Sequence, residues 1–587
     1  MINTRQFAQH RNIEGVHFLR LKGTLAERAF LHGQILADSI RTGALPPLAK
    51  KNEWLIRRSP GVIGQWPILQ DLLVRLYQRL LIPLVDRTAS AEVQAMTRAL
   101  AEGSGLPHSV VRGGLYQAEG MMLLSRMSVM RYLMREYPAG ALPGCSSGVV
   151  LGGRTQSGRL LVARNQDYPV VGYWETHTTL LFQEPTEPGH IPHIDVTTAG
   201  VHTGGLTSMN REGLTLSAHA HFGRRMSWTG ATVVDLGNRI IERARTLGEA
   251  VDFARAQKRH ANWAYVVSSA KENTAAVLEM TPDRVVVREP EDGVLAHSNY
   301  FQSEELRDEE ANMSGSCTED MKARACRMRE LLIRAGQQVV PGDLAQILGD
   351  QVDPFTQEER LFGNTLGVVT TIKSAVMDPG EQTLFVSSRK ETPVPLAATF
   401  LKIRGDEFWQ KDEARAREEA LTGAVRGYQP QNPRLVEAMR EYREAYRAWH
   451  MHPEHEDRAE RAWIAIQNTV RILPTDPNLR VQAGIFAVHL GKAREALAHF
   501  EQASQSVLSQ HTRDVIAFFQ GRCFDIEGER AQAIERYQSV LARLSERSSD
   551  IEPRLQEALK AGLRRPYRSE HSRNLHVDLQ FPDVFAY

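Results

Sequence analysis

The chain shows three successive patterns of hydrophobic and polar positions. Up to about residue 140, apolar side chains recur every three or four residues, for example in 25–42 and 89–105, which predicts helices. From residue 145 to about 403 the pattern changes to short β-branched runs divided by Gly, Asn and Pro, which predict strands and turns. Helical patterns separate some of these runs, at 232–245, 247–257 and 321–335. Strand groups divided by helix groups predict layered α+β packing.

After about residue 405 the strand pattern ends, and the chain is rich in helix-favouring Ala, Glu, Arg, Gln and Leu. The segment 490–503 matches 526–542, with glycine, alanine and aromatic residues repeated 37 positions apart. This spacing resembles the helix pairs of tetratricopeptide repeats, whose period is about 34 residues. The sequence therefore predicts a helical leader at 1–144, an α+β domain at 145–404 and a helical-repeat domain at 405–587.

Composition narrows the classes of function. Lys and Arg number 71 and Asp and Glu 70, so no basic excess is available to bind a nucleic acid. The N-terminus has no apolar signal segment, and the apolar stretch 72–85 is interrupted by Arg, Gln and Pro. This stretch is too short and too polar to span a membrane and is predicted to be a buried helix. The four cysteines are scattered, without disulfide or metal spacing, which favours a cytoplasmic location.

Cys145 is the cysteine whose surroundings indicate chemistry. It follows a Pro-Gly break and begins the first of two strand patterns, 145–152 and 159–164, which predict a hairpin. The second strand ends at Arg164 with Asp167 three residues on, so a cation and a carboxylate return towards the thiol. A nearby positive charge favours the reactive thiolate. The other three cysteines lack such neighbours and are expected to be small buried hydrophobes: Cys317, Cys326 and Cys523.

From about residue 15 to 403 the chain resembles the acyl-coenzyme A:6-aminopenicillanic acid acyltransferase family, a relative of the penicillin V acylase and bile salt hydrolase group. The Cys145 hairpin with Arg164 and Asp167 resembles the family's nucleophile and its following carboxylate. Further resemblances follow in the family's order: the leader helix at 23–34, the glycine-rich strand pair at 204–222 around Asn210, the segment 296–301 with Asn299, the helix at 321–332 with Arg324, and the closing hairpin at 366–388.

The resemblance implies a four-layer αββα Ntn-hydrolase fold, followed here by the all-α helical-repeat domain, and a chain made as an inactive precursor. The thiol of Cys145 would cut the bond after Gly144, and the freed α-amine of Cys145 would then serve as base for its own thiol. Asp167 would orient the amine, Arg164 would hold the thiolate, and Asn299 would contact the oxyanion. The implied substrate is a small-molecule acyl amide or thioester. The resemblance implies no cofactor and no metal, and it leaves hydrolase and acyltransferase open.

The sequence departs from the family pattern beside the glycine-rich strands. Several relatives have a second asparagine where this chain has Ala-His-Ala-His at 218–221. The second oxyanion donor is therefore left open between His219, His221 and a backbone N–H. A rival interpretation is a metal-dependent amidohydrolase that uses the His219 and His221 pair, because both rings face one side of a strand. It lacks a convincing third ligand.

Two further alternatives concern the tail and the pocket. A third interpretation is that the chain is an inactive scaffold, which binds protein partners or associates with itself through its helical repeats. The alternative for the helical tail is that it only packs over the α+β domain or builds an oligomer. Four aromatic residues are candidates for an acyl pocket as well as for ordinary core: Tyr173, Trp174, Phe222 and Trp228.

Overall fold

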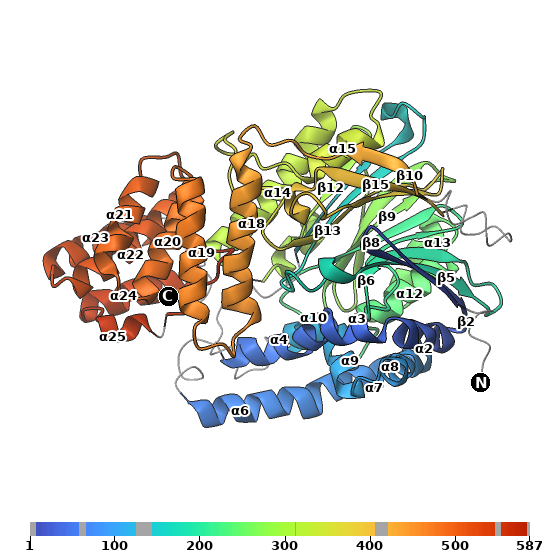
Figure 1. Cartoon of the computed structure of the whole chain (residues 1–587), viewed down its shortest axis with the longest axis horizontal. Coiled ribbons are helices and arrows are strands. Elements are labelled where there is room, and N and C mark those ends of the chain that lie inside the picture. Colours follow the sequence, from blue (N-terminus) through green and yellow to red (C-terminus); the bar gives the residue numbers. More distant parts are fainter. Residues whose placement is uncertain are drawn as a thin grey trace.

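A computed structural model describes residues 8–57, 66–124, 144–311, 313–405, 421–545, 553–573 and 575–583. Two β-sheets lie at its centre, with helices on both outer faces and a separate group of helices at one end (Figure 1). The first sheet has nine strands in the order β1 (Ala8–Ile13), β2 (Val16–Gly23), β5 (Thr178–Pro185), β6 (His193–Thr198), β7 (Thr207–Asn210), β8 (Leu214–Ala220), β9 (Trp263–Ser269), β10 (Thr274–Met280) and β11 (Val285–Arg288). The second has seven in the order β12 (Val294–His297), β3 (Gly144–Val150), β4 (Leu161–Asp167), β13 (Thr371–Asp378), β14 (Thr383–Ser387), β15 (Thr399–Arg404) and β16 (Leu421–Arg426).

Successive side chains along a strand point to opposite faces of its sheet, so each sheet contributes to two layers of core. Val149 of β3 and Val162 of β4 point into a core that the two sheets share, where they join Val266 of the larger sheet. Their neighbours Val150 and Ala163 face the other way, into a second core with α14 (Gly315–Arg334) and α15 (Pro341–Leu348). The outer face of the nine-stranded sheet is covered by α12 (Val233–Arg243) and α13 (Leu247–Arg255). The predicted α+β fold with layers in the order αββα is confirmed.

The leader differs from the helical pattern read from the sequence. It begins with β1 and β2, and β2 pairs in parallel with β5, so this segment is part of the larger sheet. The helices described in the rest of the leader pack beneath the sheets (Figure 1): α2 (Leu25–Ile35), α3 (Ala37–Thr42), α4 (Leu45–Arg57), α6 (Pro67–Leu76), η1 (Tyr77–Leu81), α7 (Ile82–Thr88), α8 (Ala91–Ser104), α9 (His108–Leu115) and α10 (Gln117–Leu124). The helix expected to be buried at 72–85 exposes Leu72 and Leu80, because only one of its faces packs against α4 and α10.

Helices α2 and α8 approach at their glycines. A Cβ atom on Gly103 of α8 would lie 2.2 Å from the backbone oxygen of Phe30 in α2, and one on Gly33 would lie 2.8 Å from the backbone oxygen of Leu100. Backbone atoms cannot rotate away as side chains do, so this close crossing of the two helices requires glycine at both Gly33 and Gly103.

We expect Gly103→Ala to lower the free energy of unfolding by about 1–3 kcal/mol or more, the usual cost of overpacking a core. Urea unfolding followed by circular dichroism measures it. Gly153→Ala is the matched control, because its added Cβ meets no atom within 4 Å. An unchanged midpoint for Gly103→Ala would contradict the close helix crossing.

The C-terminal region is all-helical after β16, which is the one described strand beyond residue 405 and was not predicted. Its helices are α18 (Arg434–Tyr446), η7 (Arg447–Met451), α19 (Arg458–Ile472), α20 (Pro477–His489), α21 (Ala493–Ala503), α22 (Gln510–Ile526), α23 (Arg530–Ser545), α24 (Pro553–Arg564) and α25 (Ser569–Ser572). The 37-residue repeat has a structural basis. Phe500 packs on Gly484 between α20 and α21, and Tyr537 packs on Gly521 between α22 and α23.

The last described residues, 575–583, return from the helical region to the α+β domain. Trp449 and Tyr442 donate hydrogen bonds to backbone oxygens of this tail segment at 2.7 Å each. Asp583 accepts from His511 of α22 at 2.7 Å and from the backbone N–H of Ser316 at 2.8 Å. The segment therefore joins the helical region to the start of α14.

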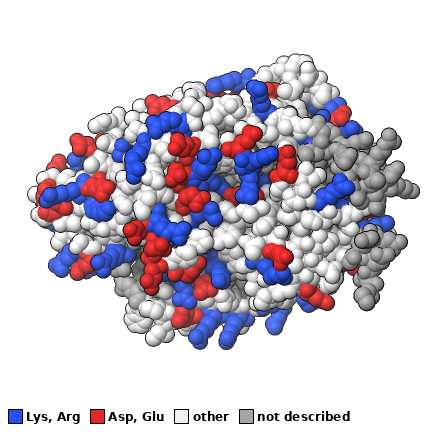
Figure 2. Space-filling view, in the orientation of Figure 1, with Lys and Arg blue, Asp and Glu red and all other residues white. Residues whose placement is uncertain are grey.

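Charges are mixed on the surface. On the face shown in Figure 2, Lys and Arg side chains are interspersed with Asp and Glu. Among the described residues, no helix combines the length and the apolar character needed to cross a membrane.

Candidate active site around Cys145

Cys145 lies near the start of β3, in the predicted hairpin with β4. The register pairs Gly144 with Asp167 and Cys145 with Gln166. The cysteine is buried, and its Sγ accepts a hydrogen bond from Nη2 of Arg164 at 2.9 Å. The hairpin thus brings the predicted cation directly onto the predicted nucleophile.

Arg164 is held in this position by neighbouring strands. Its Nη1 donates to Nε2 of His219 at 2.7 Å, and its Nη2 also donates to the backbone oxygen of Ala218 in β8. Ser147 lies close to both Arg164 and His219, with its Oγ 2.9 Å from the imidazole Nε2. Burial and the adjacent guanidinium keep the pKa of His219 well below its usual value. His219 is therefore a neutral acceptor that orients Arg164.

Asp167 lies beside the bond between Gly144 and Cys145. Its Oδ1 accepts from Oγ1 of Thr371 at 2.8 Å, whereas its buried Oδ2 has no hydrogen-bond partner among the described residues. The nearest guanidinium nitrogen, Nη1 of Arg324, is 4.0 Å from Oδ2. Burial raises the pKa of Asp167 to about 6. This oxygen would lie 3.4 Å from a Cβ on Gly144, so a carboxylate oxygen without a hydrogen-bond partner faces the residue before Cys145.

Asn299 binds the nitrogen of Cys145. Its Oδ1 accepts from the Cys145 backbone N–H at 2.8 Å and from Nη2 of Arg324 at 3.1 Å. Its Nδ2 donates to the backbone oxygen of Ala220 at 3.0 Å, so the three partners together establish which atom is oxygen. Oδ1 of Asn299 therefore faces the backbone nitrogen of Cys145, and one N–H of its amide is bound to Ala220.

Arg324 reaches the other side of the same residue. Its Nη1 donates to the backbone oxygen of Cys145 at 2.7 Å and to Oγ of Ser146 at 3.0 Å. Asp320, one turn earlier in α14, accepts from Nε at 2.8 Å and fixes the guanidinium. Helix α14 thus holds the carbonyl side of Cys145 through one side chain.

The thiol is not activated in the uncut chain. Burial raises the pKa of Cys145 above its usual value, although Arg164 and Arg324 both act to lower it. A base is therefore needed before the sulfur can attack a carbonyl.

An apolar cavity of about 600 Å³ leads to Cys145. Leader helices and the larger sheet line it together, and its apolar walls include Leu48, Leu115, Val201, Leu206, Val234 and Trp263. Of the four aromatic candidates, Trp174 lines this cavity. Trp228 is 50% exposed, Tyr173 is half-buried, and Phe222 lines a different cavity.

Other predicted residues lie away from the thiol. Asn210 is a structural turn residue: its Nδ2 donates to two backbone oxygens at the end of α12, and its Oδ1 accepts from two backbone N–H groups. His221 contacts His297 with a nitrogen separation of 2.9 Å and does not contact Cys145 or Arg164. Cys317 and Cys523 are buried as expected, but Cys326 is exposed because it lies on the outer face of α14.

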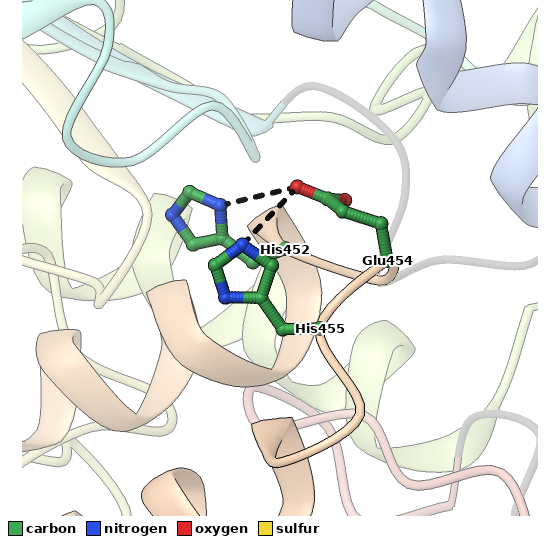
Figure 3. Close-up of side chains that lie close together, drawn as sticks. All are labelled: His452, Glu454 and His455. Carbon is green, nitrogen blue, oxygen red and sulfur yellow. Dashed lines mark ion pairs between the residues drawn. The ribbon is translucent and has the colours of Figure 1, made fainter.

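Among the described residues, His219 and His221 do not belong to a group of three potential ligands close enough to hold a metal ion, and Nε2 of His219 accepts from Arg164. Among the described residues, another group lies close enough together to hold a metal ion: His452, Glu454 and His455 (Figure 3). There Nδ1 of His455 faces Nη1 of Arg461 at 3.3 Å, so Nε2 carries the proton and points to Glu454. A metal-bound histidine donates through its other nitrogen, so this group is better explained as ion pairs.

Three contacts were not found from the sequence: Ser147 on Arg164, Thr371 on Asp167, and Asp320 on Arg324. Of these, only the contact of Asp320 could have been predicted, because Asp320 lies four residues before Arg324 in a predicted helix.

The layered fold thus carries a buried thiol that contacts Arg164, and Arg324 contacts the backbone oxygen of the same residue. The model of the acyl-coenzyme A:6-aminopenicillanic acid acyl-transferase family matches residues 154–390, which confirms over that segment the family predicted from the sequence. The match includes Arg164, Asp167, Asn299 and Arg324, and it begins nine residues after Cys145. No curated protein matches the chain.

Proposed function

We propose that the chain is an autoproteolytically activated cysteine Ntn enzyme that acts on an amide or thioester through an acyl-enzyme. The single observation that supports it best is the buried Cys145 thiol, 2.9 Å from Arg164 at the end of an apolar cavity. The acceptor of the acyl group is water in an amidohydrolase and an amine in an acyltransferase. A cytoplasmic location and a small-molecule substrate are part of this proposal.

In the self-cleavage that we propose, the sulfur of Cys145 attacks the carbonyl carbon of Gly144. The carbon–nitrogen bond breaks, the nitrogen takes up the thiol proton, and Gly144 is left as a thioester. Water then hydrolyses the thioester, which releases the Gly144 carboxyl group and restores the thiol. Glycine suits this position because a Cβ there would lie 3.2 Å from Cβ of Asp167.

In the cleaved enzyme, the α-amine of Cys145 acts as base for its own thiol, since an α-amine has a pKa of about 7.7–8.0. The contacts of the uncut chain indicate where this amine is held. Asn299 already accepts from the same nitrogen, and Asp167, whose Oδ2 has no hydrogen-bond partner among the described residues, pairs with Gly144. We therefore assign Asn299 to the amine, in place of the oxyanion contact that the resemblance implies.

The catalytic cycle follows from these positions. The amine takes the thiol proton, and the sulfur attacks the substrate carbonyl while Arg164 offsets the negative charge on sulfur. The tetrahedral intermediate collapses, the leaving amine receives the proton, and an acyl group remains on sulfur. Water or a second amine then displaces it. The acyl chain lies in the apolar cavity, whose leader walls keep it dry.

The test is mass spectrometry of the intact purified protein. We expect two fragments of roughly 16 and 50 kDa from the 65.9 kDa chain, in proportion to 144 and 443 of its 587 residues. They should co-elute under native conditions, because β2 of the leader pairs along β5. Exposure to acyl amides and thioesters should add an acyl mass to the larger fragment. One uncut chain without adducts would refute the proposal.

A further inference from the structure

A second cavity of about 440 Å³ lies between the α+β domain and the helical region. The start of α14 forms one wall, with Ser316 and Glu319, and Phe362 forms another. Helix α20 contributes Asn478 and Gln482, one turn apart on the same face. The tail segment closes the cavity with Gln580 and Phe581.

Gln482 is the unusual residue in this cavity. It is 1% exposed, in a helix whose other buried residues are nearly all apolar, yet neither its Oε1 nor its Nε2 has a hydrogen-bond partner among the described residues. In the described part of the chain, no other side chain leaves two such atoms unpaired. The buried hydroxyl of Ser316 across the cavity is also unpaired. Unpaired buried polar groups are costly, so a group that pairs with them is favoured there.

The cavity adjoins the reacting residues. A smaller cavity is lined by Gly144, Asp167, Asn299 and Arg324, which surround the backbone of Cys145, whereas the apolar cavity is lined by Cys145 itself. Gln580 and Phe581 line this smaller cavity as well as the interdomain one. Gln580 is anchored to the α+β domain by Thr370, whose Oγ1 donates to its Oε1 at 3.0 Å. The two cavities thus meet at one pair of tail residues.

We propose that the interdomain cavity binds the amine portion of the substrate, and that this portion is peptide-like. A carboxamide presents one acceptor and two donors, which match the C=O and N–H of a peptide amide in a paired contact. The apolar cavity takes the acyl chain on one side of Cys145, and the interdomain cavity takes the amide-bearing amine on the other. This assignment rests on the proposed acyl-enzyme function. It makes the helical region part of the substrate site.

The experiment compares two substrates with the same hexanoyl group, one on glycylglycinamide and one on p-nitroaniline. Gln482→Leu should lower kcat/KM for the peptide-like substrate about 10-fold or more, because a buried amide of the substrate then lacks a hydrogen-bond partner. For the anilide, which has no further amide, kcat/KM should change by less than about 3-fold. Gln467→Leu in the neighbouring α19 is the matched control, because Gln467 lines neither cavity and should leave both values unchanged.

Binding separates this inference from the proposed function. Glycylglycinamide is titrated into the full chain carrying Cys145→Ala, with and without Gln482→Leu, and followed by calorimetry. If binding disappears with Gln482→Leu, the proposed amine site is supported. An absence of acylation in the same protein would refute only the proposed acyl-enzyme function. Acylation of Cys145 with equal effects of Gln482→Leu on both substrates, or binding unchanged by that substitution, would overturn the inference and indicate that the cavity holds water.

Discussion

Cys145→Ala is expected to leave a single 65.9 kDa chain with no acyl adduct. Alanine has neither a thiol to attack Gly144 nor a sulfur to hold an acyl group, so both reactions lose their nucleophile. Removal of a covalent nucleophile commonly lowers kcat by about 10⁶-fold. Cys145→Ser keeps a hydroxyl in the same place and should cut slowly, since an alcohol is the weaker nucleophile. Denaturing gels and intact mass spectra follow both outcomes.

The control for this prediction is Cys326→Ala. Cys326 is exposed and would react with thiol reagents or acyl donors in any protein, whereas Cys145 is buried behind Arg164. The variant should cut itself and turn over as the unchanged chain does. An acyl adduct that vanishes with Cys326→Ala and survives Cys145→Ala would show that the wrong thiol has been assigned.

Asp167→Asn is expected to slow self-cleavage by about 10²–10⁴-fold, the range for loss of a group that takes part in proton transfer. The uncut chain has no α-amine at Cys145, so the rate should rise with pH as Asp167 ionises, with a midpoint near its pKa of about 6. Below that pH the carboxyl is protonated and Oδ2 cannot accept a proton. Single-turnover cleavage of freshly refolded precursor between pH 5 and 8 measures the profile, and Asp167→Asn should flatten it.

Thr371→Val is the matched variant for this profile. The hydrogen bond from Thr371 acts to lower the pKa of Asp167, so its loss should move the midpoint to higher pH and keep the profile. A wild-type rate that does not vary between pH 5 and 7, or a variant that keeps the unshifted midpoint, would argue against a proton-accepting Asp167.

The stability of the Asp167→Asn variant distinguishes a role in proton transfer from a purely structural role. The pKa of Asp167 is higher in the folded chain than its usual value of 3.8, so its stabilising contribution is present below pH 3.8 and is lost as the pH rises to about 6. At pH 7 the ionised carboxylate costs the folded state on the order of 3 kcal/mol. Asp167→Asn should therefore not lower the Tm at pH 7, although it lowers the rate.

The local part of the site was predictable. Cys145, Arg164 and Asp167 lie on one hairpin, and strand alternation with a short turn is enough to place them together. Asn299 and Arg324 were predicted through the family resemblance, and in the structure both side chains contact the backbone of Cys145. Its contact to the Cys145 nitrogen depends on how β12 pairs with β3 and how α14 packs, and neither leaves a local pattern.

The predictions for the leader were wrong at positions where contacts between distant segments determine the structure. β2 reads as a short apolar run that either a helix or a strand accommodates, and its parallel pairing with β5 spans more than 150 residues. Leu72 and Leu80 are apolar but exposed, because burial depends on which helix face meets a neighbour.

The sequence alone predicted the Cys145 hairpin, the family that matches residues 154–390, the α+β class and the 37-residue spacing of the helical region. Each of these rests on near neighbours in the chain or on a period that packing must respect. Only the tertiary structure decided that leader helices wall the apolar cavity and that the tail segment and Gln482 line a second cavity between the α+β domain and the helical region. The physical reason is that these contacts join segments hundreds of residues apart, which chain connectivity and periodicity do not specify.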